Sequence, residues 1–460
     1  MKSRSMDLTS GPVVSGIIRY TIPIVLSSAL QLLFNAADLM VVGQFCGSLS
    51  VGAISSTGAM TNLIINLFVG LSVGAGVCVA HAMGSHKDEE LHHTIHTAIP
   101  LSILCGLILT VAGIALTRPL LLMMDTPEDV LPLSETYMII YFAGVTFTLL
   151  YNFGSAILRA AGDTKSSLIY LSAAGVLNII LNLIFVICFH MNVAGVGLAT
   201  VISQALSALL VLRELMRRPD ACRYNPRESR IYAAPLRKMA TIGLPAGVQG
   251  CLFSISNVVI QSSVNSFGSV MVAGCGAAAN IEGFIWTTMN GVSQSAVNFI
   301  GQNLGAQKFD RIHKVFRSCL YIVSILGLVM GVSAYIFAPQ LLSVYITDSP
   351  AAIAAGQERM LWISLPYFVC GIMDTLTGCL RGLGKSLLPM LVTVLGVCVL
   401  RVVWVATIFQ IPRFHTPSGL FASYLVSWLV TEIVQFIMFR CSLRKLEQGA
   451  KLFCPEINPV

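Results

Sequence analysis

The stretch that decides the fold is IPIVLSSALQLLFNAADLMVVGQF, from Ile22 to Phe45. It is an apolar run, long enough to cross a hydrocarbon layer about 30 Å thick as one helix. It carries one proline near its start, Pro23, and one carboxylate near its end, Asp38. A carboxylate inside a membrane helix costs about 2.5–3.5 kcal/mol on insertion scales, and such residues normally face a bundle interior or a water-filled cavity. Asp38 is therefore the first candidate functional residue.

The rest of the chain has the composition of a membrane protein. Of its 460 residues, 55% are hydrophobic and only 11% are charged, and the mean hydropathy is +0.80. A soluble protein carries about a quarter charged residues. We expect no removable signal peptide, and we interpret the thirteen scattered cysteines as buried reduced thiols. The sequence predicts an all-α polytopic membrane protein with twelve spans, at 18–42, 57–80, 97–116, 136–158, 168–189, 195–214, 241–264, 278–300, 318–338, 361–380, 387–409 and 418–439.

The basic residues predict the orientation of these spans. With the N-terminus inside, 24 of the 28 lysines and arginines fall in the inside segments or, for Arg19 and Arg213, at the inner ends of spans. Arg118, Arg359 and Arg413 fall outside, and Arg401 lies within the eleventh span. This is the asymmetry of the positive-inside rule. We therefore expect a multi-pass protein of the cell membrane with both termini cytoplasmic.

The two halves of the chain are related by an internal repeat. An offset of 222 pairs Pro23 with Pro245, and the same offset pairs Asn35 with Asn257. Each half holds six spans, so both halves enter the membrane in the same direction. This predicts two six-helix lobes related by a pseudo-two-fold axis along the membrane normal, with a substrate path between them. The expected parts are an N-lobe (1–215, helices 1–6), a cytoplasmic linker (216–240), a C-lobe (241–445, helices 7–12) and a cytoplasmic tail (446–460).

Four polar residues of the first half are predicted to lie at similar depth. Asp38 is in the outer half of helix 1, Asn178 and Asn182 share one face of helix 5 at i and i+4, and Thr200 is in the outer half of helix 6. Hard oxygens of this kind suit a small cation, and Asp38 could alternatively exchange a proton. The competing interpretation is that these side chains only make polar contacts between helices.

Further residues are weaker candidates for function. Pro23 and Pro245 would kink the paired helices 1 and 7, either as hinges between two states or as static kinks near the helix entry. Arg401 could form a buried, structural ion pair with Asp374 or Glu432. Candidates for the wall of a substrate cavity are Asn35, Asn152, Asn257, Glu282 and Asp374.

A histidine-rich connector precedes the third span. It reads HAMGSHKDEELHHTIH (81–96), with His92 and His96 one helical turn apart, a spacing that suits a metal. The matching connector of the second half, QNLGAQKFDRIHKVFR (302–317), has a single histidine. We interpret both as amphipathic cytoplasmic connectors and expect no metal site. No phosphate-binding loop is visible, so we expect no nucleotide cofactor. The placement of the net charge of +7 is explained by membrane topology, so we expect no nucleic-acid partner.

Several stretches resemble the multidrug and toxic compound extrusion (MATE) transporters over about residues 12–445. They are FNAADLMVVGQF (34–45), LRAAGDTK (158–165), FIGQNLGAQK (299–308) and LRGLGKS (380–386). The resemblance implies two six-helix lobes and efflux driven by inward flow of Na⁺ or H⁺. The family's N-lobe cation site has an aspartate on helix 1, Asn-x-x-x-Asp on helix 5 and a threonine on helix 6. Asp38, Asn178 and Thr200 match this pattern, whereas Asn182 replaces the second aspartate. Phe253 stands where another branch has a helix 7 glutamate.

We therefore expect a secondary antiporter, not an enzyme. It would export amphipathic or cationic organic compounds in exchange for H⁺ or Na⁺ by alternating access, as a monomer in the lipid bilayer. The alternative is a flippase or exporter of lipid-linked saccharides in the same wider superfamily. That function would need more cationic residues facing the cavity, and only Arg401 lies mid-membrane. An intramembrane enzyme would need an HExxH or paired-aspartate motif, and the sequence has neither.

Overall fold

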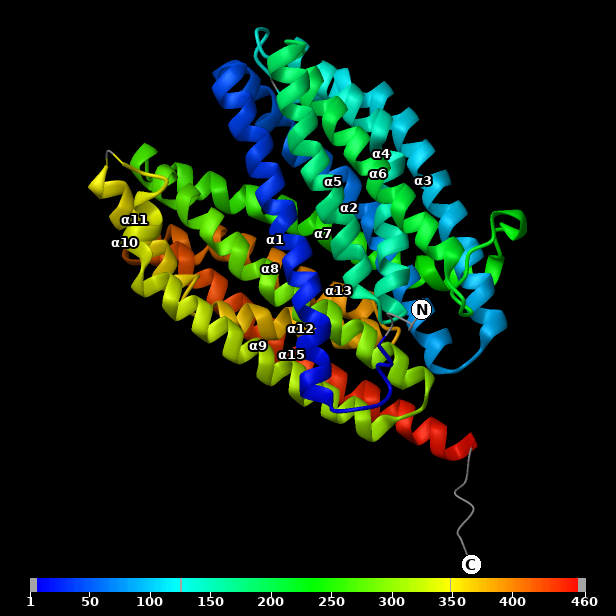
Figure 1. Ribbon diagram of the computed structural model, residues 1–460. Coiled ribbons are helices and arrows are strands. Elements are labelled where there is room, and N and C mark those ends of the chain that lie inside the picture. Colours follow the sequence, from blue (N-terminus) through cyan, green and yellow to red (C-terminus); the bar gives the residue numbers. More distant parts are fainter. Residues whose placement is uncertain (1–5, 125, 348, 454–460) are drawn as a thin grey trace, which may run out of the picture. The chain divides into compact units, whose positions relative to one another are not determined.

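The protein is built from long helices (Figure 1). The structure, a computed structural model, describes residues 6–124, 126–347 and 349–453. The helices of the first half are α1 (Val13–Phe45), α2 (Ser48–Gly84), α3 (Asp88–Met123), α4 (Leu131–Ala160), α5 (Thr164–Leu183) and α6 (Asn192–Arg217). Those of the second half are α7 (Ala233–Asn265), α8 (Ser269–Gly305), α9 (Phe309–Ile336), α10 (Ala338–Ser343), α11 (Pro350–Trp362), α12 (Tyr367–Gly382), α13 (Leu387–Thr393), α14 (Leu400–Ala406) and α15 (Pro417–Phe453).

Five short helices complete the described chain. Two are π-helices, which continue α5 and join α13 to α14, and three are 3-10 helices in loops. They are η1 (Ile184–Cys188), η2 (Pro226–Glu228), η3 (Val394–Val399), η4 (Ile408–Gln410) and η5 (Pro412–Phe414). The π-helical segments lie inside two predicted spans, and such segments are local departures from regular α-helix.

The helices confirm a polytopic membrane protein. In the described residues, eleven helices are long and apolar enough to cross a membrane, or twelve if α11 and α12 form one bent span. These two helices meet at 48°, so the regular span predicted at 361–380 is wrong in shape and starts too late. The break ends at Pro366, which has no N–H to donate and whose ring clashes with a preceding carbonyl in a regular helix.

An exposed apolar stripe shows how one of these helices meets the bilayer. On α3, Leu104, Leu107, Ile108 and Val111 are all exposed, and Val111 is 70% exposed. Their spacing of three and four residues places them on one face of the helix. A wide apolar face of this kind would be unfavourable in water and fits a lipid-facing surface.

The chain forms two compact units. Unit 1 comprises Met1–Asp7 and Ile22–Gly250, and unit 2 comprises Leu8–Thr21 and Cys251–Val460. These units differ from the predicted lobes at the first helix of each half, because the first part of α1 belongs to unit 2 and the first part of α7 belongs to unit 1. Both helices change units close to a proline of the internal repeat.

Within unit 1, glycines explain why the first part of α7 packs against α2. A Cβ on Gly74 would lie 2.9 Å from the backbone nitrogen of Gly243, and a Cβ on Gly243 would lie 2.6 Å from the Cα of Leu71. Gly70 and Gly247 are packed equally tightly against each other. Small residues four apart on each helix let two backbones approach closely in a membrane. The glycine spacing therefore holds this part of α7 in unit 1.

Within unit 2, the first part of α1 packs against α8 through side chains. The hydroxyls of Thr21 and Ser295 are 2.7 Å apart and both residues are buried. The ring of Tyr20 meets Phe299 edge to face, with centroids 5.4 Å apart. These contacts account for the assignment of this segment to unit 2.

The polar linker between α6 and α7 is fixed on unit 1. Arg218 is buried and bonds Asp220 at 2.6 Å, with Asp163 at 4.0 Å. Burial opposes the charge of Arg218, but the hydrogen bonds that it donates to Asp220 prevail and raise the pKa of its guanidinium. Further along, the backbone N–H of Tyr232 donates to the hydroxyl of Thr97 at 3.1 Å. The linker is thus held along α3 by hydrogen bonds and an ion pair.

Candidate cation site and its surroundings

The four polar residues predicted to share a depth come together in unit 1. The amide nitrogen of Asn182 donates to the carboxylate of Asp38 at 2.5 Å and to the carbonyl oxygen of Asn178 at 3.3 Å. The amide nitrogen of Asn178 lies 3.5 Å from the hydroxyl of Thr200. Asn178 and Asn182 are buried, and Asn182 has no exposed surface. Helices α1, α5 and α6 therefore contribute one connected polar cluster.

A glycine on α5 positions Asp38 in this cluster. Gly175 leaves no room for a Cβ, because the ring of Phe34 from α1 occupies that space. Phe34 and Asp38 are four residues apart on α1 and so lie on the same face. Gly175 and Asn182 are seven residues apart on α5, which also places them on one face. The close contact at Gly175 thus brings the carboxylate of α1 to the asparagines of α5.

The cluster opens on a small polar cavity of about 50 Å³. This volume has room for a small cation with a few waters, since one water needs only about 10–15 Å³ by this measure. Seven of its eleven lining residues are polar, namely Gln31, Asn35, Asp38, Asn178, Thr200, Ser203 and Gln204. A carboxylate, amide oxygens and hydroxyls are hard oxygen ligands of the type that Na⁺-like cations accept.

One oxygen in the cluster has no partner. With the amide oriented to donate to Asp38, the carbonyl oxygen of Asn182 is buried and accepts no hydrogen bond within the described residues. Leaving a buried polar atom unpaired costs about 1–3 kcal/mol. A purely structural polar contact would therefore leave the Asn182 oxygen unpaired. A bound cation would give this oxygen a partner, and rotation of the amide would change which atom is unpaired.

Gln31 and Gln204 are members of the cavity that the sequence analysis missed. Gln31 is seven residues before Asp38 on α1, and Gln204 is four residues after Thr200 on α6. Both spacings place the glutamine on the same helix face as the residue already singled out. Helical periodicity applied to the two anchors would have found them.

The asparagines proposed for a substrate cavity have different surroundings. Asn35 lines the same small cavity as Asp38. Asn152 is on α4 and donates to the carbonyl of Thr148, one turn earlier, at 2.9 Å. Asn257 is on α7 and its side chain is exposed. The structure therefore joins only Asn35 to the cation cluster.

Glu282 is neutralised by a partner that the sequence analysis assigned to an outside loop. Arg359 of α11 donates to its two carboxylate oxygens at 3.1 and 2.7 Å. Glu282 is 6% exposed and Arg359 is 8% exposed. This is a buried bidentate ion pair between α8 and α11, so Glu282 has no free charge to offer a cationic substrate.

Arg401 does not form the predicted ion pair. Within the described residues it has no salt bridge to Asp374 or Glu432, so that prediction is wrong. Its Nε donates to the hydroxyl of Ser427 at 3.0 Å, and its guanidinium lies 3.9 Å from the ring centroid of Tyr424. The cation–π contact replaces a carboxylate in stabilising this buried cation.

Asp374 has partners of its own on α8 and α12. Its carboxylate accepts a hydrogen bond from Trp286 and lies close enough to Arg381 to be stabilised by that charge. Its backbone carbonyl accepts a bond from Ser293 at 2.8 Å. Asp374 therefore lies at the α8–α12 contact of unit 2.

The comparisons with known proteins agree with this architecture. The MatE family model matches twice, over residues 23–184 and 245–407, and the two matches begin 222 residues apart. The probable multidrug resistance protein YpnP of Bacillus subtilis (strain 168) is 28% identical over 86% of this chain and 89% of its own. The multidrug export protein MepA of Staphylococcus aureus (strain bovine RF122 / ET3-1) is 22% identical over 86% of this chain and 87% of its own.

Solved structures share the fold at low identity. A crystal structure of MATE in the bent conformation matches with a TM-score of 0.88 at 21% identity, over 96% of this chain and 98% of that one. The outward-facing conformation of a multidrug resistance MATE family transporter of the MOP superfamily matches with a TM-score of 0.89 at 21% identity, over 96% and 98%.

The fold and the repeated family match define a multi-pass membrane transporter and not an enzyme. The matched residues make up most of the chain and confirm the internal repeat with its offset of 222. The chain belongs to the MatE family, the MATE multidrug efflux transporters.

Proposed function

We propose that the protein is a secondary antiporter that exports amphipathic or cationic organic compounds in exchange for H⁺ or Na⁺. The observation that carries the proposal is the position of Asp38 in a small polar cavity, bonded to Asn182 and close to Asn178 and Thr200. The names of the multidrug relatives support the substrate class. In this proposal the chain works as a monomer in the cell membrane, with both termini cytoplasmic.

The coupling site would bind its ion on three helices. Asp38 supplies the one negative charge, and the amide of Asn182 holds that carboxylate by a hydrogen bond. Asn178 and Thr200 supply further oxygens at the cavity wall. Either a proton on Asp38 or a sodium ion among these oxygens would neutralise the charge and change its bonding to α5.

Helix α1 would carry the effect of the ion to the rest of the transporter. Its first part belongs to unit 2 and its later part, with Asp38, belongs to unit 1. Pro23 lies just after the change and removes a backbone hydrogen bond there, so the bend of α1 can differ between two states. Pro245 gives α7 a similar site. An ion that favours one bend, and a substrate that favours the other, would drive export.

The substrate path is proposed to be lined by Asn35, Asn152, Asn257 and Asp374. Asn35 borders the ion cavity itself, so a bound substrate would compete with the geometry that the ion requires. Glu282 keeps a structural role in this proposal, because Arg359 neutralises it.

Transport in proteoliposomes tests the function. Full-length protein is reconstituted, and uptake of ethidium is followed under an imposed Na⁺ gradient or an imposed pH gradient. Coupling free energies between two ligands correspond to about 5–150-fold effects. We therefore expect Asp38→Asn to reduce gradient-driven uptake about 10-fold or more. Asp129→Asn, the same change at an exposed loop position, is the matched control and should transport normally.

Two outcomes would reject the proposal. If Asp38→Asn transports ethidium as well as the wild type under the effective gradient, Asp38 does not couple an ion. If neither gradient accelerates uptake by the wild type, the protein is not an antiporter of either ion. The gradient that works identifies the coupling ion.

A further inference from the structure

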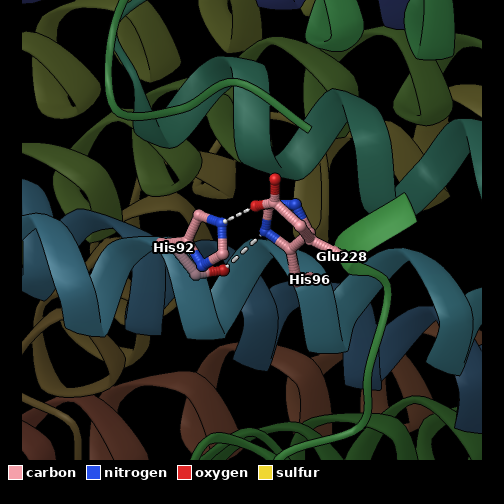
Figure 2. A group of neighbouring side chains, drawn as sticks. All are labelled: His92, His96 and Glu228. Atoms are coloured by element: carbon pink, nitrogen blue, oxygen red, sulfur yellow. Dashed lines mark hydrogen bonds and ion pairs between the residues drawn. The ribbon is translucent and has the colours of Figure 1, made fainter. Parts of the chain in front are cut away.

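Three ligand-type side chains meet where the linker crosses the start of α3 (Figure 2). His92 and His96 lie one turn apart on α3 with stacked rings, whose centroids are 3.9 Å apart. Glu228 ends the short helix η2 and reaches the two imidazoles from the linker. One ligand atom from each of the three lies within 4.8 Å of the others. We call these three residues the histidine cluster.

The hydrogen bonds define the protonation state of His96. Its Nδ1 lies 2.9 Å from the carbonyl oxygen of His92, which can only accept, so Nδ1 carries the proton. Its Nε2 accepts the backbone N–H of Asn225 at 3.0 Å. His96 is therefore neutral, with the Nε2 lone pair directed at the linker. Histidines that bind metals usually donate the other ring N–H to a backbone carbonyl or a carboxylate, as His96 does here.

Glu228 is held as a carboxylate beside His92. The Nε2 of His92 lies 2.8 Å from one carboxylate oxygen, and the side-chain amide of Asn225 donates to the other at 2.5 Å. The side chains of His92 and Glu228 are 37% and 53% exposed, so an ion can reach them and both can rotate.

We propose that the histidine cluster binds a divalent transition-metal ion such as Zn²⁺ through His92, His96 and Glu228. Two imidazoles and one carboxylate are a ligand set that suits such ions, with water in the remaining position. Metal–ligand bonds of about 2.0–2.2 Å in a tetrahedral site require ligand atoms about 3.4 Å apart. Rotation of the exposed His92 and Glu228 side chains would close the present separations.

The ion would replace two hydrogen bonds and keep both rings neutral. It takes the place of the Asn225 N–H at Nε2 of His96, and of the His92–Glu228 hydrogen bond. If His92 binds through Nε2, its ring proton moves to Nδ1, so no net proton is lost from the imidazole. The bound ion would thus join α3 to the linker. This site lies in unit 1 and shares no residue with the cation cluster around Asp38. The inference is thus independent of the proposed antiport.

Binding of Zn²⁺ to the full-length protein tests the site. The protein is prepared without a polyhistidine tag, stripped of metal with a chelator and placed in nanodiscs. Binding of Zn²⁺ is then measured by calorimetry, and the absorbance of bound Co²⁺ is the second probe. The variants are His92→Gln and Glu228→Gln. The matched control is His93→Gln, because His93 stacks on Tyr232 with ring centroids 4.0 Å apart and is not part of the cluster.

We expect one equivalent of Zn²⁺ to bind, and each of the two variants to weaken binding at least about 10-fold, as even outer-shell substitutions do at metal sites. His93→Gln should bind like the wild type. Zn²⁺ should also protect His92 of the wild type from modification by diethyl pyrocarbonate, a readout that needs no variant to fold.

The proposal is overturned by any of three results. The first is no saturable binding of Zn²⁺ or Co²⁺ to the wild type. The second is wild-type affinity in both His92→Gln and Glu228→Gln. The third is no protection of His92 by Zn²⁺. Each result would mean that the cluster only makes hydrogen bonds between α3 and the linker.

Discussion

Glu282 and Arg359 join α8 to α11 through two hydrogen bonds between buried charges, at 3.1 and 2.7 Å. Replacing Glu282 by glutamine keeps the shape of the side chain and removes its charge. Arg359 then remains as a buried cation, with one neutral acceptor and the ring of Phe421 at 5.8 Å. The variant Glu282→Gln therefore tests whether this residue is structural.

The magnitude follows from the geometry of the pair. Two unit charges about 4 Å apart attract by about 4 kcal/mol at an effective dielectric constant of 20. Breaking a buried pair by removing one partner typically costs about 3–5 kcal/mol, because the other charge stays buried. We expect Glu282→Gln to cost about 3 kcal/mol of unfolding free energy. This corresponds to a fall in Tm of roughly 6–12 °C, at about 2–4 °C per kcal/mol for a unit of this size.

Thermal unfolding in detergent micelles measures the effect. The double variant Glu282→Leu/Arg359→Met removes both charges and should lose less than the sum of its single variants, because no unpaired charge is left. Glu128→Gln is the same chemical change at an exposed position. It should change the unfolding free energy by no more than about 0.5 kcal/mol, and Tm should change correspondingly little.

A different result would return Glu282 to the substrate cavity. If Glu282→Gln leaves Tm unchanged while the KM for an organic cation rises, its carboxylate contacts the substrate and the structural interpretation fails. Additive losses in the double variant would show that the two charges do not interact.

Three further predictions concern packing, ion binding and the linker. Gly247→Leu should lower Tm by an amount corresponding to at least about 1–3 kcal/mol, because its Cβ would overlap the backbone of α2. Gly58→Leu should have little effect, because a Cβ added at Gly58 would meet no other atom within 4 Å. Equal losses in the two variants would contradict the close packing. Asn182→Asp adds a second carboxylate to the site and should tighten Na⁺ binding, since a cation relieves the repulsion; unchanged Na⁺ dependence of transport would count against the site. Burial raises the pKa of the Cys222 thiol to about 12, so its thiolate fraction at pH 8 is only roughly 10⁻⁴ and the group becomes reactive only as the pH rises towards that value. Maleimide should therefore label Cys222 roughly a thousandfold more slowly than the exposed Cys441 until SDS is added, and equal rates would show that the linker is not docked.

The polar cluster around Asp38 was predictable because helical geometry acts within a single helix. The i, i+4 spacing places Asn178 and Asn182 on one face. The predicted span directions assign Asp38 and Thr200 the same depth, and residues at the same depth can meet. The same reasoning extends to Gln31 and Gln204. That Asn182 donates to Asp38 was not predictable, because it depends on the approach of Phe34 to Gly175.

Partners on distant helices were not predictable. Glu282 and Arg359 are 77 residues apart. Hydropathy places Arg359 in a loop, whereas the structure places it on α11, which is bent by 48° relative to α12. Arg401 bonds Ser427 and stacks on Tyr424 of α15, and a charge count cannot distinguish that aromatic site from a carboxylate.

The sequence by itself determined the membrane class, most of the helical spans, the repeat and which polar residues share a face of one helix. Apolar length, residue period and a constant offset carry that information, and each is local or strictly periodic. Only the tertiary structure decided which unit holds the first parts of α1 and α7, and which linker residue meets His92 and His96. Those outcomes depend on how closely two backbones approach, and this is set by side chains on both partners at once.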